Sequence, residues 1–145
     1  MECEFPTINS NRKEIRKIFN ITKTIAVIGL SPDESKASHS VAKYLQKQGF
    51  KIVPIYPKEE TILGEKVYRS LLDVPFEIDM VDIFRKAKEL DNVAEICIER
   101  GDIKVFWAQK GIVNNKAAAR AKDAGMIVAQ NMCTMVEHRN LHEEL

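Results

Sequence analysis

The apolar residues of this chain gather in short runs that end at glycine, proline or other turn residues. Runs of this length, rich in isoleucine and valine, favour strands that are buried on both faces. We predict strands at residues 23–28, 51–55, 80–84, 104–108 and 126–130, and a shorter strand near residues 66–68.

Between these runs, apolar residues recur at helical spacing. Val41, Tyr44 and Leu45, for example, lie at positions i, i+3 and i+4, which places them on one face of a helix. We predict a first helix that is capped by Asn9 or Ser10 and runs to about residue 19. Further helices are expected at residues 38–48, 89–100 and 115–124, with a helical turn near residues 70–73, and a glycine follows each of these three helices.

Strands that alternate with helices in this way indicate an α/β fold, a Rossmann-like three-layer arrangement with a mostly parallel sheet. Because no linker or repeat interrupts the pattern, we predict a single domain. It should span residues 22–141, after an N-terminal arm and helix at residues 1–21 and before a tail at residues 142–145. In such sheets a ligand lies beyond the carboxyl ends of the strands, so the loops after residues 28, 55, 84, 108 and 130 are the ones to inspect.

Composition narrows the class of protein without indicating a ligand. The chain has 145 residues, 45% of them hydrophobic and 30% charged, which suits one globular domain. Its formal net charge of +1 provides no long-range attraction for nucleic acid or membranes, so an anion must be bound by local geometry. The three cysteines are far apart and no apolar run is long enough to span a bilayer, which together favour a cytoplasmic protein.

The apolar run at residues 24–28 ends at Gly29, a few residues before an expected helix. Glycine lets the backbone approach a phosphate closely, and a helix start offers free N–H groups and a positive dipole end. Polar side chains accompany this loop at Ser31, Lys36, Ser38, His39 and Ser40. We interpret it as a phosphate-binding loop, although it lacks the second and third glycines of the dinucleotide fingerprint. The alternative is a surface loop before a capped helix.

The loop after residues 51–55 discriminates between nucleotides. Sites for NAD commonly place an acidic residue here to bind a ribose hydroxyl. This chain has Pro54, Tyr56, Pro57 and Lys58 instead. The rigid apolar residues suit an adenine face and the lysine suits a phosphate on the ribose, so the missing carboxylate counts against NAD. The alternative is an ordinary strand end followed by a turn.

The remaining loops carry further candidate ligand contacts. Phe84 and Arg85 are interpreted as a pocket wall and a donor to phosphate, or else as a core residue and a solvated one. Gln109 can both donate to and accept from an amide-containing ligand. Cys133 is a candidate reactive thiol at the mouth of the cleft, with a small buried hydrophobic residue as the alternative.

The sequence contains no recognisable catalytic constellation. His39 has no sequence neighbour that would mark it as a general base. His138 and His142 lie four residues apart on a possible terminal helix, a spacing that suits a metal ion, but two ligands without a third favour a solvated polar tail. We assign neither a catalytic residue nor a metal to the chain.

Short motifs occur in order along most of the chain. They are IAVIGLS at residues 25–31, IVPIYP at 52–57, LGEKVY at 63–68, VDIFR at 81–85, VFWAQKG at 105–111, AAARAKDAG at 117–125, NMC at 131–133 and EH at 137–138. In these motifs the chain resembles the small stand-alone CoA-binding proteins of bacteria and archaea, which are similar to the CoA-binding domain of the succinyl-CoA ligase alpha subunit. The resemblance covers roughly residues 22–141.

The resemblance implies a coenzyme A site and assigns its parts. The adenosine would lie near residues 54–58, and the pantetheine arm across the loops that hold Phe84, Arg85, Gln109 and Gly111. The pyrophosphate would lie at Gly29, Ser31, Lys36, Ser38, His39, Ser40 and Val41. Family members often carry arginine and proline in this first loop, and a lysine there should bind phosphate less tightly because it lacks the bidentate fork.

The favoured hypothesis is a protein that binds coenzyme A or an acyl-CoA without catalysis of its own, because the ligase domain with the phosphorylated histidine has no counterpart in this chain. Its expected partners are the coenzyme, another copy of the chain or an acyl-CoA enzyme, with neither nucleic acid nor membrane. Three alternatives stay open. They are an NAD(P)-binding redox protein, the CoA-binding half of an acyl-CoA ligase that works with a separate partner chain, and a partner-binding scaffold whose cleft is vestigial.

Overall fold

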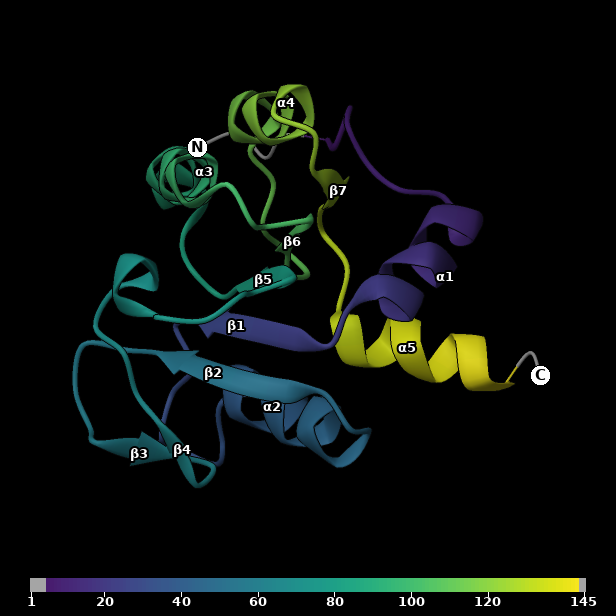
Figure 1. The fold of residues 1–145 in the computed structure, drawn as a ribbon. Coiled ribbons are helices and arrows are strands. Elements are labelled where there is room, and N and C mark those ends of the chain that lie inside the picture. The colour runs from purple at the N-terminus through teal and green to yellow at the C-terminus, as the bar shows by residue number, and fades with distance from the viewer. Residues whose placement is uncertain (1–4, 144–145) are drawn as a thin grey trace.

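The computed structural model describes residues 5–143 and shows a parallel sheet between two layers of helices (Figure 1). The helices are α1 (Arg12–Ile21), α2 (Ala37–Lys47), α3 (Leu90–Arg100), α4 (Asn115–Asp123) and α5 (Thr134–Glu143), with single 3₁₀ turns at Leu71–Asp73 and Ala87–Glu89. The strands are β1 (Thr24–Ile28), β2 (Lys51–Ile55), β3 (Thr61–Ile62), β4 (Glu65–Lys66), β5 (Met80–Ile83), β6 (Val105–Ala108) and β7 (Ile127–Ala129). No helix in this described part of the chain is long and apolar enough to cross a membrane.

The main sheet has five strands in the order β2-β1-β5-β6-β7, and every pairing in it is parallel. The predicted α/β fold with a parallel sheet is therefore confirmed. From β1 the chain moves outward to β2, passes through the β3–β4 hairpin, and returns to the other side of β1 at β5. This reversal makes the junction between β1 and β5 the switch point, where open α/β sheets form a crevice.

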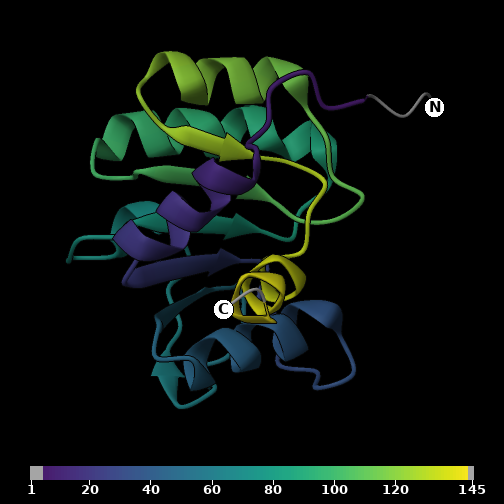
Figure 2. The ribbon, with the colours of Figure 1, turned by 90° about the vertical axis from the view of Figure 1, so that its right-hand side faces the viewer.

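The strands of the main sheet are largely buried on both faces because helices cover the two sides of that sheet. Along β1, Ile25 and Val27 face the layer of α1, α2 and α5, whereas Ala26 faces the layer of α3 and α4. Figure 2 shows α5 lying against α1 and α2. On the opposite face, the small residues Ala117 and Ala121 let α4 pack closely beside α3. This double coverage explains why the strands have continuous apolar sequences.

The cap of the first helix differs from the prediction. Asn11 caps α1 by accepting a hydrogen bond from Glu14 N–H, and the Glu14 carboxylate accepts from Asn11 N–H in return. Asn9 and Ser10 were wrong as capping residues because their side chains donate to the carbonyls of Gln130 and Val128, respectively. These bonds attach the N-terminal arm to the last strand of the sheet.

The segment after β7 is helical, as the spacing of its histidines allowed, but it is packed against the domain and not a solvated polar tail. It forms α5, which runs across the expected boundary at residue 142 and packs on α1 and α2. His138 is buried on this helix, and burial, followed by the nearby His142, lowers its pKa. The short segment has too few apolar residues to indicate such burial, which arises from rings that α1 and the α2–β2 region supply.

A buried polar cluster ties α5 to the sheet. Asp82 lies on β5, the middle strand, with no exposed surface, and it accepts hydrogen bonds from Gln109 Nε2 at 2.5 Å and Thr134 Oγ1 at 2.9 Å. Burial raises the pKa of Asp82 from 3.8 to about 7, although both hydrogen bonds act to lower it. A protonatable carboxyl group thus connects β5, the end of β6 and the start of α5.

We expect the variant Asp82→Asn to change how stability depends on pH. The pKa of Asp82 is higher in the folded chain than in the unfolded chain, so its contribution is fully present below about pH 4 and is lost as the pH rises through about 7. A difference of 1 between the folded and unfolded pKa values corresponds to about 1.4 kcal/mol of stability. Urea unfolding between pH 4 and pH 8 should show that the variant gains stability relative to the parent as the pH rises.

The lowered pKa of His138 makes stability rise with pH, which is opposite to the effect of Asp82. Because both proteins contain His138, its effect cancels in the difference between parent and variant, and that difference reports on Asp82. Asp33→Asn is the matched control, since Asp33 lies in an exposed loop. If Asp82→Asn and the parent show the same pH profile, the buried carboxyl does not titrate in this range.

Candidate functional site

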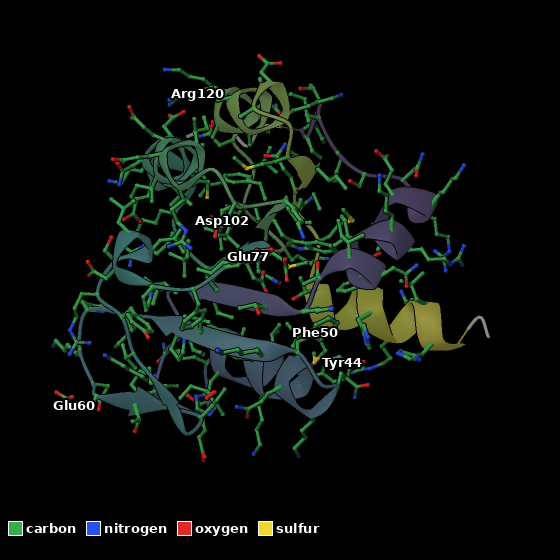
Figure 3. The ribbon with its side chains drawn as sticks, in the orientation of Figure 1. Tyr44, Phe50, Glu60, Glu77, Asp102 and Arg120 are labelled. Atoms are coloured by element: carbon green, nitrogen blue, oxygen red, sulfur yellow. The ribbon has the colours of Figure 1, made fainter. Side chains whose placement is uncertain are left out.

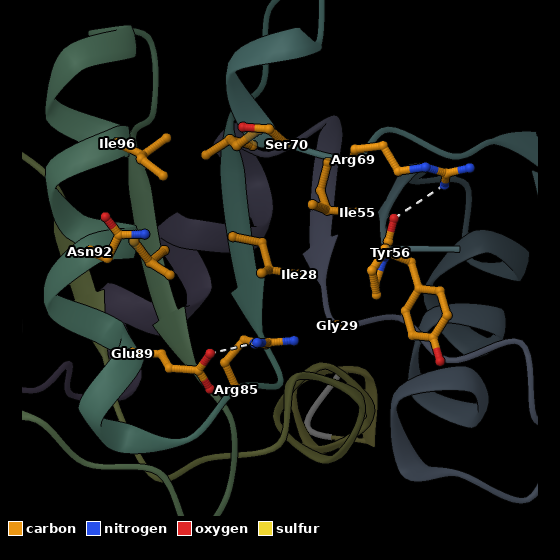
Figure 4. A pocket seen from close by; sticks show the side chains of 13 residues that line it. Ile28, Gly29, Ile55, Tyr56, Arg69, Ser70, Arg85, Glu89, Asn92 and Ile96 are labelled. Atoms are coloured by element: carbon orange, nitrogen blue, oxygen red, sulfur yellow. Dashed lines mark hydrogen bonds and ion pairs between the residues drawn. The ribbon is translucent and has the colours of Figure 1, made fainter. Parts of the chain in front are cut away.

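A cleft of about 350 Å³ lies at the switch point of the sheet, where β2, β1 and β5 end (Figure 4). Apolar side chains from the strand ends and α3 line its inner part, and arginine, glutamate and asparagine side chains lie around them. The lining residues are Ile28, Gly29, Ile55, Tyr56, Pro57, Arg69, Ser70, Leu71, Arg85, Glu89, Asn92, Val93 and Ile96. Its size is in the range of small-molecule sites.

Gly29 brings the ends of three strands together. It has φ of 88°, and a Cβ placed on it would lie 2.5 Å from the carbonyl oxygen of Phe84 and 3.2 Å from Arg85 Cδ. On its other side, Gly29 N–H donates to the Ile55 carbonyl at 2.9 Å. Only glycine combines this conformation with this close approach.

The loop after Gly29 is folded on itself by side chains that were predicted to contact a ligand. Ser31 N–H donates to Ser38 Oγ at 3.0 Å, and the Ser31 carbonyl accepts from His39 Nδ1 at 2.9 Å. Ser38 and His39 are accordingly buried, whereas Lys36 and Ser40 are exposed. The two buried side chains shape the loop from inside.

The start of α2 adjoins this loop and has no side-chain cap. Lys36 occupies the capping position without making a capping hydrogen bond, so the first turn presents backbone N–H groups and the positive end of the helix dipole. Asp33 accepts hydrogen bonds from the Ser35 N–H and hydroxyl, which lower its pKa and keep it negative. With this carboxylate present, any anion here must be bound by backbone groups and Lys36 rather than by a net positive loop.

The loop after β2 is held by an arginine that the sequence did not indicate. Arg69 Nη1 donates to the carbonyls of Tyr56 at 3.3 Å, Lys58 at 2.9 Å and Glu59 at 2.8 Å, as Figure 4 shows for Tyr56. Glu59 has φ of 70°, and these contacts stabilise its left-handed turn. Tyr56 and Pro57 lie in the cleft wall and Lys58 is exposed, whereas Pro54 is buried within the sheet.

The opposite wall comes from α3 and the loop after β5. Arg85 forms an ion pair with Glu89 at 2.5 Å, and this hydrogen bond lowers the pKa of Glu89. Asn92 and Ile96 continue the wall along the helix (Figure 4). No ligand contact was predicted on this helix, because its apolar spacing alone does not show which side chains line a cleft. Phe84 is half-buried and packs against the α2 side of the sheet.

The other predicted contacts lie away from this cleft. Val41 belongs to the core beneath α2. Gln109 is buried and its amide nitrogen donates to Asp82 and Thr134. Gly111 N–H donates to Asn131 Oδ1 at 2.7 Å, and Cys133 is half-buried before α5. The structure therefore brings Gly29, Tyr56, Pro57 and Arg85 into the cleft. The other predicted residues lie in the loop before α2, within α2, in β2 and the loop after it, and after β5, β6 and β7.

This arrangement suits a ligand that combines an apolar or aromatic part with anionic groups. Ile28, Ile55 and Val93 form an apolar base into which a flat ring or thin chain would fit. Arg69 and Arg85 lie at its rim and can donate to negatively charged groups. The uncapped start of α2 lies just beyond Gly29, along the same edge of the sheet.

Comparison with known proteins agrees with the fold. A family model described as a CoA binding domain matches residues 23–139. The uncharacterized protein YneT of Bacillus subtilis is 39% identical over 130 residues, which are 90% of this chain and 96% of that protein. A solved structure of a hypothetical protein from Pyrococcus horikoshii has a TM-score of 0.88 and 38% identity, and the match covers 98% of this chain and 99% of that one.

Larger enzymes contain a similar segment. The ADP-forming acetate–CoA ligase of Methanocaldococcus jannaschii is 36% identical over 85 residues, which are 59% of this chain but only 12% of the ligase. The similarity to that enzyme is thus confined to a small part of its length.

The close approach at Gly29 predicts a difference between two glycine variants. We expect Gly49→Ala to lose about 1–2 kcal/mol of stability, because φ there is 101° but no atom lies within 4 Å of the new Cβ. Gly29→Ala should lose at least about 3 kcal/mol, because the same strain is joined by the clash with the Phe84 carbonyl. Urea unfolding of both variants measures the difference. Equal losses of unfolding free energy would show that the close contact between Gly29 and the Phe84 carbonyl does not exclude a side chain.

Proposed function

This chain belongs to the CoA-binding domain family, and from that membership we propose that it binds coenzyme A or an acyl-CoA along the carboxyl edge of its sheet. The observation that supports this most directly is the cleft at the β1–β5 switch point, next to the uncapped start of α2. A cleft and an adjoining anion-binding helix start match the two ends of a nucleotide coenzyme.

The proposed placement follows the edge of the sheet. The pyrophosphate lies beside Gly29 and Ser31 at the first turn of α2. Because the N–H groups of Gly29 and Ser31 already donate to the Ile55 carbonyl and to Ser38 Oγ, its oxygens accept from N–H groups of the first turn of α2 and from the Lys36 ammonium. The adenine ring lies against Tyr56 and Pro57 in the apolar part of the cleft. Two features support this arrangement: the glycine that brings the backbone close, and the rigid loop that Arg69 holds after β2.

The pantetheine arm is proposed to cross Phe84 and Arg85 toward Gly111 and Cys133. Gln109 acts indirectly in this proposal, because its amide nitrogen is already bonded to Asp82 and Thr134. The arm would therefore meet backbone groups of this loop rather than the glutamine side chain. Ser38 and His39 likewise act by shaping the first loop.

Binding without catalysis is the form of the proposal that the chain supports best, since its similarity to the acetate–CoA ligase covers only 12% of that enzyme. The same similarity supports a second candidate, in which this chain supplies the CoA-binding part of an acyl-CoA ligase whose remaining parts are on a separate chain. Copurification with such a chain, and acyl-CoA formation only by the mixture, would distinguish the second candidate from the first.

Thermal unfolding with coenzyme A, and separately with NAD⁺, tests the proposed ligand. A ligand at one hundred times its dissociation constant stabilises the folded chain by about 2.7 kcal/mol, which raises the Tm by roughly 5–10 °C for a domain of this size. We expect coenzyme A to raise the Tm in a concentration-dependent way and NAD⁺ to leave it nearly unchanged. A rise with NAD⁺ and none with coenzyme A would reject the proposal.

Lys36→Ala and Lys47→Ala form a matched pair for this experiment, because the two lysines lie at opposite ends of α2 and both are exposed. Lys36→Ala should weaken coenzyme A binding about tenfold, with a shallower dependence on salt, whereas Lys47→Ala should bind as the parent does. If the two variants weaken coenzyme A binding equally, the proposed position of the pyrophosphate at the start of α2 is wrong.

Lys58 is predicted to recognise the phosphate on the ribose of coenzyme A. Lys58→Ala should weaken coenzyme A binding about three- to tenfold, because an exposed ammonium contributes modestly to binding a phosphate. Its affinity for dephospho-CoA, which lacks that phosphate, should match that of the parent. Calorimetric titration of the parent and the variant with both ligands measures these affinities. An equal loss of affinity for coenzyme A and for dephospho-CoA would contradict this role of Lys58.

A further inference from the structure

His138 and His142 face one another on α5, away from the proposed coenzyme site. Their Nε2 atoms are 3.3 Å apart, and their ring centroids are 4.5 Å apart with an angle of 59° between the planes. His138 is buried and His142 is exposed. The centroids are closer than a head-on arrangement of the two nitrogens would allow, so the rings do not point directly at one another.

Aromatic side chains fix the orientation of the His138 ring. Phe19 of α1, Tyr44 of α2 and Phe50 lie with ring centroids 5.1, 5.6 and 5.6 Å from it, each edge to face. Figure 3 labels Tyr44 and Phe50 beside the turn between α2 and β2. The Tyr44 hydroxyl lies 2.9 Å from His138 Nδ1, so this second ring nitrogen already has a hydrogen-bond partner. Its Nε2, which lies 3.3 Å from His142 Nε2, is therefore the ring nitrogen that is left for a metal ion.

The separation of the two nitrogens suits a shared metal ion better than it suits a direct hydrogen bond. A separation of 3.3 Å is long for a hydrogen bond. Two imidazole nitrogens that bind zinc at about 2.0–2.1 Å with a tetrahedral angle lie roughly 3.3–3.4 Å apart. A histidine that binds a metal through one ring nitrogen usually makes a hydrogen bond through the other. The Tyr44 hydroxyl would be that hydrogen-bond partner for His138.

The pair also has space beside it. A cavity of about 270 Å³ adjoins both rings and is lined by Arg16, Phe19, Asn20, His138, Leu141 and His142. It can hold a metal ion with water or a small anion, and Arg16 in its wall favours the anion. Within residues 5–142 no group of three or more histidine, cysteine or acidic side chains is placed to hold a metal, so the other positions must come from solvent.

We propose that His138 and His142 form a two-histidine site for a divalent transition metal ion such as Zn²⁺ or Ni²⁺, with Tyr44 as a positioning residue. Water or an anion from the adjoining cavity completes the coordination. The site is separate from the proposed coenzyme cleft and does not depend on it. Its test uses the metal-free chain and metal salts alone, without coenzyme A.

Thermal unfolding with millimolar Zn²⁺, Ni²⁺ or Mg²⁺ tests the site. Zn²⁺ and Ni²⁺ should raise the Tm in a concentration-dependent way, and Mg²⁺ should not, because it prefers oxygen ligands. His142→Ala should bind these metals at least tenfold more weakly, and it should fold because this side chain is exposed. Asn140→Ala, a change on the same helix outside the histidine pair, should respond as the parent does.

The single tryptophan gives a local signal for the same event. Trp107 lies 5.7 Å from the Phe19 ring, which in turn contacts His138, so Ni²⁺ bound at the pair should quench its fluorescence. Tyr44→Phe should raise the Ni²⁺ concentration needed for half-maximal quenching about tenfold, because His138 Nδ1 loses its hydrogen bond to the Tyr44 hydroxyl. The Tm of this variant without metal is measured as well. A Tm equal to that of the parent would show that the weaker metal binding comes from loss of positioning and not from loss of folding.

Two results would overturn the proposal. The first is the absence of any Tm rise or quenching with millimolar Zn²⁺ or Ni²⁺ in the parent. The second is an equal response in the parent and in His142→Ala, which would assign binding to other groups, such as Cys133 or His39, that this variant retains.

Discussion

The carboxyl edge of the sheet depends on one close approach, that of Gly29 to the carbonyl of Phe84. β1 lies between β2 and β5, and its end must turn toward α2 while the loops on both sides stay in contact with it. No Cβ fits at this point, and Gly29 N–H bonds to the Ile55 carbonyl on the opposite side. Backbone contacts therefore set the position of the cleft and of the start of α2 before any charged side chain contributes.

The two arginines that line the cleft at this edge already have partners. Arg69 donates to three carbonyls of the loop after β2, and Arg85 is paired with Glu89. With a formal net charge of +1, the chain has no broad field that would concentrate anions here. An anionic ligand must share or exchange these contacts, so its recognition depends on geometry, on backbone N–H groups and on the apolar base of the cleft rather than on total charge.

The order and type of the main elements were predictable because they depend on neighbours in the sequence. The run at residues 51–55 is β2 as predicted, and Gly101 ends α3 in a left-handed conformation. Predictions that needed distant partners were wrong. Asn9 does not cap α1, because its side chain bonds to Gln130, 121 residues away in sequence. A terminal helix was considered from the sequence, but its burial was not, because it depends on α1 and α2 packing against it.

For the candidate site, the sequence by itself determined which residues follow the strand ends, and it thereby placed Tyr56 and Arg85 at the carboxyl edge. Spacing along the chain suffices for this, because parallel strands that end together bring their loops to one edge. Only the tertiary structure decided that Arg69 and Asn92 complete the cleft, and that aromatic rings from α1 and α2 enclose His138. Those arrangements depend on contacts and burial between elements that are far apart in sequence, and such contacts leave no periodic pattern in the chain.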